Sequence, residues 1–384
     1  MEAYLDNSAT TFVLPEVKDI CVRTMTMDFG NPSSLHKKGM EAEQYVRVAR
    51  ETIAGTLKVD PKEITFTSGG TESNNLALIG GAMAHRRTGK HIITTQIEHS
   101  SVANPVKFLE KEGFRVTYLP VSPEGVVDRQ ALLDALDEDT SLVSIMQVNN
   151  EIGALEPVAE LGRLVHEKNP DILFHVDAIQ SYGKFIIRPR RENIDLLSVS
   201  GHKIHGPKGS GFLYVRSSAR ILPQILGGGQ QQGMRSGTEN VPAIAGLGVA
   251  AGAMYQNYEE HVEKLFSLRE RLVAGLSGME GVTINGPKGR EGAPHIVSAS
   301  FEGIRAEVLL HALEEREIYV SSGSACSSNH PVYSATLTAI GVRKDLLDCT
   351  VRFSLSIFNT EAQIDYTLDV LNELVPKLSR YRRR

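Results

Sequence analysis

The chain of 384 residues has only three cysteines, Cys21, Cys326 and Cys349, and no CxxC pair. Three is an odd number and the three lie far apart in the sequence, so a disulfide framework is not expected. Such sparse cysteine usage is typical of a reducing compartment. At least one of the three is therefore expected to carry a free thiol.

The chain also lacks an excess of charge of one sign and any long hydrophobic run. Lysine and arginine total 41 against 46 aspartates and glutamates, so no broad cationic face is expected for a nucleic-acid backbone. No segment approaches the roughly 18 apolar residues that span a bilayer, and the start MEAYLDNSATT has no basic stretch followed by an apolar one. We expect a soluble, cytoplasmic protein that binds neither nucleic acid nor a membrane.

Short β-branched segments alternate with segments of helical periodicity through the first 215 residues. The predicted strands are residues 63–67, 91–95, 115–119, 142–148, 172–176, 196–199 and 212–215. The predicted helices between them include residues 41–57, 71–85, 101–111 and 158–168. This alternation predicts an α/β fold with a mostly parallel central sheet covered by helices.

The length of the chain favours two domains. A stretch of small residues at 243–253 precedes an amphipathic segment at 258–276, and the domain change is placed there. Strands are predicted at 296–301 and 350–356, followed by a last helix with Thr360 and Gln363 as its capping box. The prediction is a large domain over residues 16–256 and a smaller α+β domain formed by residues 1–15 and 257–384.

Polar, chemically capable residues follow one predicted strand after another. In an open α/β sheet the ligand crevice lies beyond the carboxyl ends of the strands, so these residues are expected to converge on one pocket. They are Gly70 and Thr71, His99, Asn149, Asp177 and Gln180, and the segment Ser200 to Lys203.

The turn Ser68-Gly69-Gly70-Thr71 joins a predicted strand to the start of a helix. Unpaired backbone N–H groups and the positive end of the helix suit an anion there, and a phosphate group is the natural occupant. A nucleoside triphosphate site is rejected because residues 84–91 lack the first P-loop glycine and end in histidine. The glycines at 206–211 precede a strand, so they do not fit a dinucleotide fingerprint.

Lys203 lies in the loop Ser200-Gly201-His202-Lys203 at the predicted crevice. A buried amine at this place could have a lowered pKa and form a Schiff base with an aldehyde cofactor. Asp177 could pair with a pyridinium nitrogen, and His99 could stack on the ring or shuttle protons. A metal site at His202 and His205 is less attractive, because no carboxylate or cysteine stands at ligand spacing beside them.

Cys326 lies in a run of small polar residues, Ser321 to His330, that cannot supply a packed core. The run predicts an exposed, mobile loop, from which a thiol could reach a bound substrate and then present sulfur to an acceptor. Cys349 in a strand-like setting and Cys21 on the first predicted helix are interpreted as structural.

Motifs of distinctive sequence follow one another along nearly the whole chain. They are LDNSATT (5–11), FGNPSSLH (29–36), TSGGTESNN (67–75), EHSS (98–101), NNEIG (149–153), HVDAIQ (175–180), SGHKIHGPKG (200–209), GGGQQQGMRSGTEN (227–240), GSACSS (323–328) and VRFSLS (351–356). In this order they resemble the NifS/IscS-type cysteine desulfurases, aminotransferase-like enzymes of fold type I that depend on pyridoxal 5'-phosphate.

The resemblance implies a cofactor-binding set. Lys203 carries the cofactor as a Schiff base, Asp177 pairs with the pyridine nitrogen, and Gln180 bonds the ring oxygen. His99 stacks on the ring. The residues implied to hold the phosphate are Thr71, Ser200 and His202, with Thr238 reaching the phosphate of the other subunit of a homodimer. No metal ion is implied.

The resemblance also implies the substrate and the reaction. Arg352 and Asn149 hold the carboxylate of L-cysteine, for which a guanidinium fork is well suited. Lys203 removes the α-proton, the thiolate of Cys326 attacks the substrate sulfur, and alanine leaves while Cys326 holds a persulfide. His99 is the candidate for moving the thiol proton. The sulfur then passes to an acceptor protein, either an iron–sulfur scaffold or a thiolation protein.

Two segments depart from the family pattern. Gln230 to Gln232 stand where relatives often carry His-Glu-Arg, and Ser356-Ile357 stand where they carry Gly-Arg. Neither departure touches a catalytic position. Two alternatives stay open: a related aminotransferase or selenocysteine lyase, which would not need Cys326, and a silent sulfur-carrier subunit, which would not need Lys203.

Overall fold

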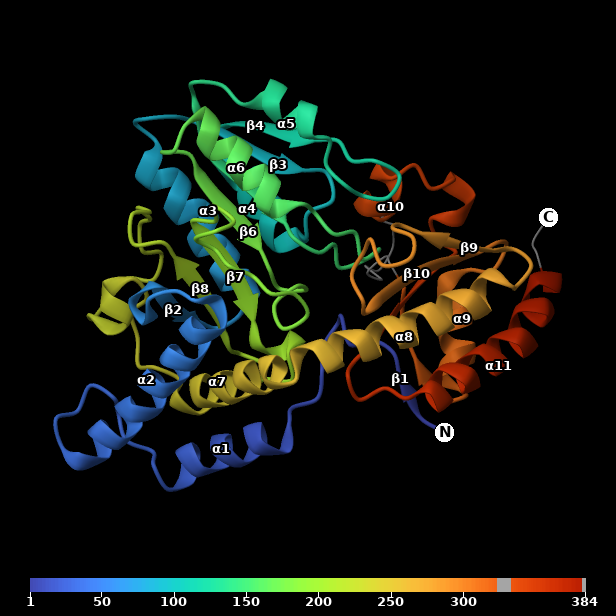
Figure 1. Cartoon of the computed structure of the whole chain (residues 1–384), viewed down its shortest axis with the longest axis horizontal. Helices are drawn as coiled ribbons and strands as arrows, with labels where there is room; N and C mark the ends of the chain where they lie inside the picture. The colour runs from blue at the N-terminus through green and yellow to red at the C-terminus, as the bar shows by residue number, and fades with distance from the viewer. Residues whose placement is uncertain (323–332, 382–384) are drawn as a thin grey trace.

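The computed structural model describes residues 1–322 and 333–381, and its largest element is a seven-stranded sheet (Figure 1). The strands are β2 (Ile64–Thr67), β3 (His91–Thr95), β4 (Arg115–Leu119), β5 (Thr140–Met146), β6 (Leu173–Asp177), β7 (Leu196–Ser200) and β8 (Gly211–Val215). They lie in the order β2-β8-β7-β6-β5-β3-β4. Strand β8 is antiparallel to both of its neighbours, and the other pairs are parallel.

Helices cover both faces of this sheet. One face packs against α1 (Pro15–Thr26), α2 (Lys37–Leu57), α5 (Arg129–Ala135), α6 (Val158–Lys168) and α7 (Val241–Gln256). The other packs against α3 (Gly70–His85) and α4 (Ser100–Lys111). Successive strand residues alternate between the two cores, since Val143 and Phe174 join the first while Leu142 and Leu173 join the second. The inner strands β5, β6 and β7 are therefore buried along their whole length, and this includes polar residues such as His175 and Ser198.

A second, antiparallel sheet lies beside the first, on the right in Figure 1. Its strands, in spatial order, are β12 (Ser321–Ser322), β13 (Thr350–Ser354), β10 (Ile296–Phe301) and β9 (Val282–Asn285). Helices α8 (Tyr258–Ser277), α9 (Ala306–Glu314) and α11 (Glu361–Leu378) form a core with it. The N-terminal β1 (Ala3–Tyr4) pairs in parallel with β11 (Ile318–Tyr319), so the start of the chain also joins this core.

The remaining elements are short. They are α10 (Ala335–Ala339) and the 3₁₀ helices η1 (Pro61–Glu63), η2 (Gly201–Lys203), η3 (Gln230–Gly233), η4 (Lys344–Leu346) and η5 (Ser379–Tyr381). Within the described part of the chain, no helix has the length and apolar character needed to cross a bilayer.

The predicted α/β fold with a mostly parallel central sheet is confirmed. Each of the seven strands predicted for that sheet forms, with ends that differ from the prediction by at most two residues. The capping box of Thr360 and Gln363 at the start of α11 is also present. The division into domains at residues 15/16 and 256/257 stays a prediction, although the two sheets and their cores lie on either side of it.

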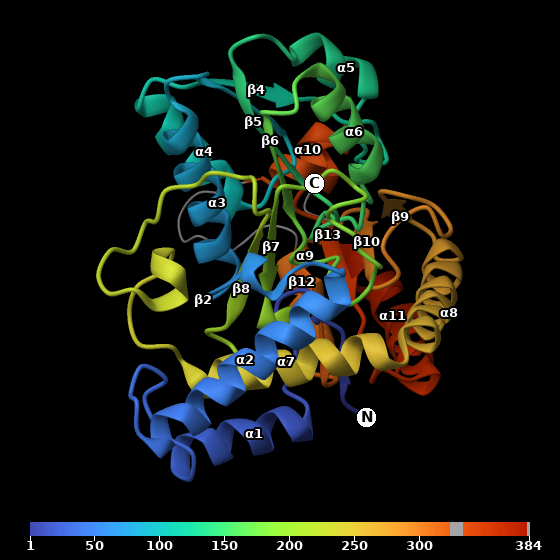
Figure 2. The ribbon, with the colours of Figure 1, turned by 60° about the vertical axis from the view of Figure 1, so that its left-hand side comes forward.

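The small-residue stretch at 243–253 forms most of α7, which the pattern alone does not indicate. Helices α1, α2 and α7 lie side by side beneath the large sheet (Figure 2). A Cβ on Gly248 would meet Ala49 of α2 at 2.6 Å, and one on Gly246 would meet Cys21 Sγ of α1 at 2.8 Å. The small residues therefore let three helices approach closely, and this packing outweighs the low helix propensity of glycine.

Candidate active site

One cavity of about 390 Å³ opens where strands of the large sheet end. Its walls come from the ends of β2, β3, β5, β6 and β7 and the turns after them, together with Ser8, Ala9 and Arg352 from the part of the chain built on the second sheet. Residues predicted from sequence that line this cavity are Gly70, Thr71, His99, Asp177, Gln180, Ser200, His202, Lys203 and Arg352. Segments nearly 350 positions apart in the chain thus meet at one place.

Asp177 is the buried carboxylate of the cavity. Its Oδ1 accepts the backbone N–H of Ile179 at 2.9 Å, and its Oδ2 accepts Asn74 Nδ2 at 2.8 Å. Burial raises the pKa of Asp177, while these hydrogen bonds and the nearby His99 and Lys203 oppose that rise. No lysine or arginine of residues 1–322 or 333–381 forms an ion pair with it. A cation placed in the cavity would supply the missing counter-charge.

Lys203 provides a half-buried amine. Its Nζ donates to the backbone carbonyl of Ser8 at 2.5 Å and to that of Ala9 at 2.7 Å. Burial, with a smaller contribution from Arg352, lowers the pKa of Lys203 to about 8. An appreciable fraction of the amine is therefore unprotonated near neutral pH, which a nucleophile for an aldehyde requires.

The start of α3 forms an anion cradle. Gly69 has φ +151°, a conformation open to glycine but strained for other residues, and it sets the turn into the helix. A Cβ on Gly70 would meet Ile179 Cδ1 at 2.1 Å, so the helix approaches the cavity wall closely. Backbone N–H groups at this helix start face the same cavity as Thr71 and Ser200.

His202 and His205 do not form a metal pair. His202 Nδ1 lies 3.2 Å from Thr10 Oγ1, and burial lowers its pKa to about 4. Both ring nitrogens of His205 are engaged, Nδ1 with the Phe12 carbonyl and Nε2 with Ser356 Oγ. In the described ranges no cluster of three or more metal-ligating side chains occurs.

His99 is the N-cap residue of α4. Its Nδ1 accepts the backbone N–H of Ser101 at 3.1 Å and lies 2.8 Å from Ser101 Oγ. Burial lowers the pKa of His99, Lys203 and Arg352 lower it further, and only Asp177 raises it. The imidazole is therefore neutral near pH 7.

Arg352 lies where β13 passes the cavity. Its Nη2 pairs with Asp6 Oδ1 at 2.8 Å and its Nη1 donates to the carbonyl of Asn150 at 2.9 Å. Its Nε has no hydrogen-bond partner within the described residues. The guanidinium is thus held in place from two sides while it retains donor capacity toward the cavity.

Asn149 is buried, and its side chain is used within the protein. Its Oδ1 accepts the backbone N–H groups of Glu151 and Ile152, and its Nδ2 donates to the carbonyl of Ile97. Its neighbour Asn150 lines the cavity instead. A substrate-binding role for Asn149 stays a prediction.

Gln180 joins the N-terminal segment to the large sheet. Its Nε2 donates to the carbonyl of Ser8 at 3.1 Å, and its Oε1 lies 3.4 Å from Nε2 of the buried His295. The predicted contact of Gln180 with the ring oxygen of a cofactor stays a prediction.

Besides Asn149, one described site residue predicted from sequence does not line this cavity, and one predicted residue is not described. Thr238 is exposed and lies outside the lining. Cys326 falls outside the described residues. The other two thiols have raised pKa values because of burial, and that of Cys349 reaches about 11, so neither favours a reactive thiolate.

The two departures from the family pattern have structural roles. Gln231 Oε1 accepts the backbone N–H of Phe66 at 3.1 Å and Arg50 Nη2 at 3.2 Å, which anchors its loop to the edge of the large sheet. Ser356 bonds to the buried His205 at 3.0 Å. Neither residue lines the cavity.

Sequence reasoning gave no role to several residues that shape the site. Ser101 of α4 lines the cavity, Asn74 of α3 lies behind it, and Asp6 fixes Arg352 from the N-terminal segment. The motifs LDNSATT, TSGGTESNN and EHSS contain all three residues, so a signal was present. Only the folded chain shows which partner each one has.

Known proteins share this fold and sequence. The model of the Aminotransferase class-V family matches residues 3–367. A cysteine desulfurase IscS of Clostridium botulinum (strain Hall) is 44% identical over 384 residues, which is 100% of this chain and 95% of the relative. A cysteine desulfurase IscS of Klebsiella pneumoniae is 45% identical over 380 residues, 98% of this chain and 93% of the relative.

Solved structures agree with this match. A NifS-like protein with 40% identity superposes with a TM-score of 0.93, covering 98% of this chain and 100% of the other. The structure of SspA in complex with cysteine has 36% identity and a TM-score of 0.82, over 93% of this chain and 100% of the other. The sequence and the fold are those of the Aminotransferase class-V family, and the chain belongs to this family. Within the family it belongs to the cysteine desulfurases, whose cofactor is pyridoxal 5'-phosphate.

The residues of the cavity fit that cofactor. Asp177 offers an uncompensated buried carboxylate to a protonated ring nitrogen, and Lys203 offers an amine of lowered pKa to the aldehyde. The cradle at Gly69 and Gly70, where a Cβ on Gly70 would collide with Ile179, offers backbone donors to the phosphate.

Proposed function

We propose that this chain transfers the sulfur of L-cysteine to the thiol of Cys326 and releases L-alanine. In the balanced reaction the C–S bond of the free amino acid breaks, an S–S bond forms on Cys326, and the β-carbon gains a proton. Cysteine and the enzyme thiol thus give alanine and an enzyme persulfide. The observation that carries the proposal is the convergence of Lys203, Asp177 and Arg352 on one cavity.

When bound, pyridoxal phosphate draws electrons away from the α- and β-carbons of the substrate. Asp177 would hold the ring nitrogen protonated. Lys203, with a pKa of about 8, can take a proton from the α-carbon and return it to the product. The carboxylate of cysteine would lie against Arg352, whose position is already fixed by Asp6 and Asn150.

The placement of strand β12 supports Cys326 as the sulfur acceptor. Ser321 of β12 pairs with Arg352 of β13, so the chain reaches Ser322 beside the cavity. Four residues further on is Cys326, and covalent geometry limits the separation of the two Cα atoms to about 14 Å. A thiol on this tether can therefore reach a cysteine whose carboxylate is held by Arg352.

The test measures alanine and sulfide from purified protein and cysteine, with Cys326→Ala, Lys203→Ala and the control Cys21→Ala. Cys326→Ala should bind the cofactor but lose sulfur transfer. Lys203→Ala should lose both sulfur transfer and the visible absorption of the bound cofactor. The control Cys21→Ala should match wild type. Alanine and sulfide formation that persists in Cys326→Ala, with selenocysteine as the better substrate, would instead support a lyase. Full activity of Lys203→Ala would overturn the proposal altogether.

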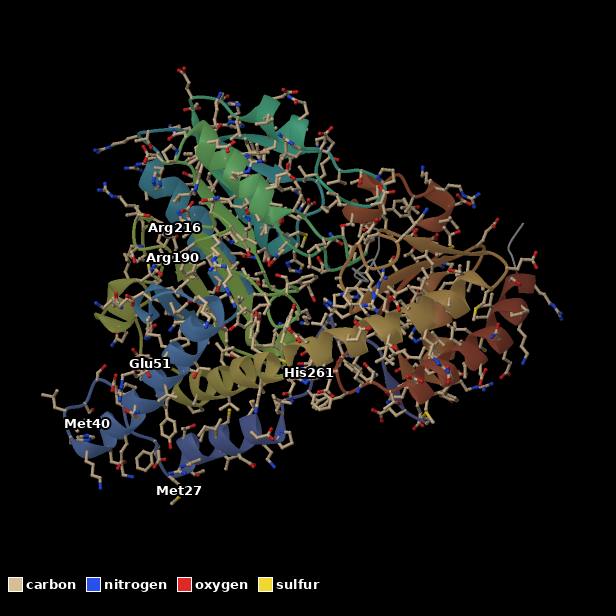
Figure 3. All side chains as sticks on the ribbon, viewed as in Figure 1. Met27, Met40, Glu51, Arg190, Arg216 and His261 are labelled. Atoms are coloured by element: carbon tan, nitrogen blue, oxygen red, sulfur yellow. The ribbon has the colours of Figure 1, made fainter. Side chains whose placement is uncertain are left out.

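A homodimer with a composite site is part of the proposal. Thr238 is exposed, as are the large apolar side chains Met25, Met27, Phe29, Leu35 and Met40 on α1, on α2 and between them. Figure 3 shows Met27 and Met40 at the end of the molecule remote from the second sheet. An apolar set of this kind is typical of a surface that another chain covers, and a second copy is the occupant we propose.

Mixing two inactive variants tests the composite site. The Thr238→Val and Lys203→Ala proteins are unfolded and refolded together, so that mixed dimers form. In a mixed dimer, one of the two sites combines an intact Lys203 from one subunit with an intact Thr238 from the other. Activity should therefore return on mixing. Sedimentation should give a dimer that Met27→Asp/Leu35→Asp disrupts. A monomer at working concentration, or no recovery on mixing, would contradict the composite site.

We also propose that the persulfide passes to an acceptor protein in the cytoplasm, either an iron–sulfur scaffold or a thiolation protein. Radiolabelled cysteine would place labelled sulfur on Cys326, and transfer to each purified acceptor would be followed after the excess cysteine is removed. Transfer to neither class would contradict this part.

A further inference from the structure

A chain of hydrogen bonds connects Asp177 to His99 along the cavity wall. Asn74 Nδ2 lies 2.8 Å from Asp177 Oδ2 and 2.9 Å from Ser101 Oγ. Ser101 Oγ in turn lies 2.8 Å from His99 Nδ1. Asn74 is fully buried and Ser101 is only 6% exposed, so these contacts lie in a largely desolvated place.

The donor and the acceptor of each of these three hydrogen bonds are fixed. Asp177 also accepts the backbone N–H of Ile179, which favours its ionised, accepting form, so Asn74 must face it with its amide nitrogen. The second hydrogen of that nitrogen goes to Ser101 Oγ. Ser101 therefore uses its own hydrogen toward His99 Nδ1.

His99 Nδ1 thus faces two donors, because the backbone N–H of Ser101 points at it as well. A proton on Nδ1 would point at the hydrogens of both donors. This repulsion disfavours the imidazolium form and the Nδ1–H tautomer. His99 also caps the positive N-terminal end of α4. Of the charged groups that face it, Lys203 and Arg352 oppose a positive imidazole, and Asp177, already bonded to Asn74, favours one.

We propose that His99 works as a neutral hydrogen-bond donor through Nε2–H and does not carry protons, with Ser101 and Asn74 as the residues that position it. Within residues 1–322 and 333–381 no hydrogen bond to Nε2 occurs, and the ring lines the cavity. A ring nitrogen Nε2 that already carries a hydrogen cannot accept the thiol proton. Loss of that Nε2 hydrogen would leave an unstable imidazolate. The donor role toward cofactor or substrate rests on the proposed function, whereas the tautomer rests on the geometry alone.

Nitrogen NMR of ¹⁵N-histidine-labelled protein reads the tautomer directly, before and after loading with pyridoxal phosphate. The His99 signals are assigned by their loss in His99→Gln. We expect a protonated Nε2 and an unprotonated Nδ1 throughout the range from about pH 5 to 8, where free imidazole titrates. A His99 that titrates in this range, or that carries its proton on Nδ1, would overturn the proposal whether or not the enzyme desulfurates cysteine.

Ser101 is tested by the same signal. Ser101→Ala removes the hydroxyl donor but leaves the backbone N–H, so the pKa of His99 should rise, while Ser101→Thr keeps a hydroxyl and should restore the wild-type signal. A purely structural role for Ser101 would change the thermal stability and leave the His99 pKa where it was.

The donor role is tested by a matched pair, His99→Gln and His99→Met. The two side chains have similar size, but only glutamine can donate a hydrogen bond, and neither carries protons. We expect His99→Gln to retain at least about tenfold more kcat than His99→Met, the effect of one hydrogen bond to a charged group. Equal loss in both variants would mean that His99 must move a proton.

Discussion

The ammonium of Lys184 donates a hydrogen bond to the backbone carbonyl of Lys203 at 2.8 Å. Lys184 is buried, and desolvation, with a smaller contribution from Lys203, lowers its pKa to about 7. A second lysine is therefore buried next to the amine that the cofactor needs. Since burying an ammonium costs free energy, its position at the backbone of Lys203 indicates that it fixes the course of the 201–203 turn.

Lys184→Met tests this relationship. The variant removes the donor and a buried charge but keeps most of the volume, so kcat should fall about five- to tenfold, equivalent to about 1 kcal/mol for one hydrogen bond. The melting temperature of the cofactor-free protein should not fall, because the cost of burying the charge disappears as well. Lys168→Met, on the exposed end of α6, is the control. Unchanged kcat in Lys184→Met would show that the turn holds its course without this bond.

Gly70→Ala should weaken cofactor binding. The added methyl would meet Ile179 Cδ1 at 2.1 Å, and displacing that side chain moves the wall of the cavity next to Asp177. Overpacking costs about 1–3 kcal/mol, so the affinity for pyridoxal phosphate should fall at least about tenfold. Titration of cofactor-free protein measures this fall. The double variant Gly70→Ala/Ile179→Ala should recover most of it, and the absence of recovery would locate the fault in the helix start itself.

Asp6→Asn should raise the KM for cysteine and leave kcat nearly unchanged. The carboxylate holds Arg352 Nη2 at 2.8 Å in a partly exposed pair, and such a pair contributes about 1 kcal/mol. A mobile guanidinium would bind the substrate carboxylate about fivefold less tightly. Steady-state kinetics against Glu2→Gln, an exposed control near the same chain end, separates this effect from a general loss of charge. A fall in kcat with constant KM would mean that Asp6 acts on the chemistry and not on binding.

The sequence predicts those features of the site that follow from chain order. Polar residues after successive parallel strands must share one edge of the sheet, and this rule placed Thr71, His99, Asp177 and Lys203 in the same cavity. The rule concerns local position, so it works wherever the residue directly follows a strand.

The same reasoning does not reach contacts between distant segments. Ser8 and Arg352 come from opposite ends of the chain and meet the cavity through long-range pairings, of β1 with β11, of β13 with β10 and β12, and of Asp6 with Ser354. Asn149 follows a strand, yet its amide closes its own turn, because backbone N–H groups at 151 and 152 lie nearer than the cavity. Competition between such partners depends on distances that one sequence does not specify.

Glu156→Gln should make the protein less sensitive to alkaline pH. Glu156 Oε2 accepts the backbone N–H of Val127, its Oε1 has no partner within the described residues, and burial raises its pKa from 4.5 to about 8. Between these two values the folded chain holds a proton that the unfolded chain has released, so the stability that this group supports is complete below pH 4.5 and is lost as the pH rises through about 8. Glutamine stays neutral and keeps an acceptor for Val127. The free energy of unfolding of wild type, measured by urea titration, should therefore fall between pH 6 and pH 9 by about 3 kcal/mol more than that of the variant. Parallel pH profiles for the two proteins would contradict this prediction. They would mean that Glu156 is already ionised in the folded chain at neutral pH.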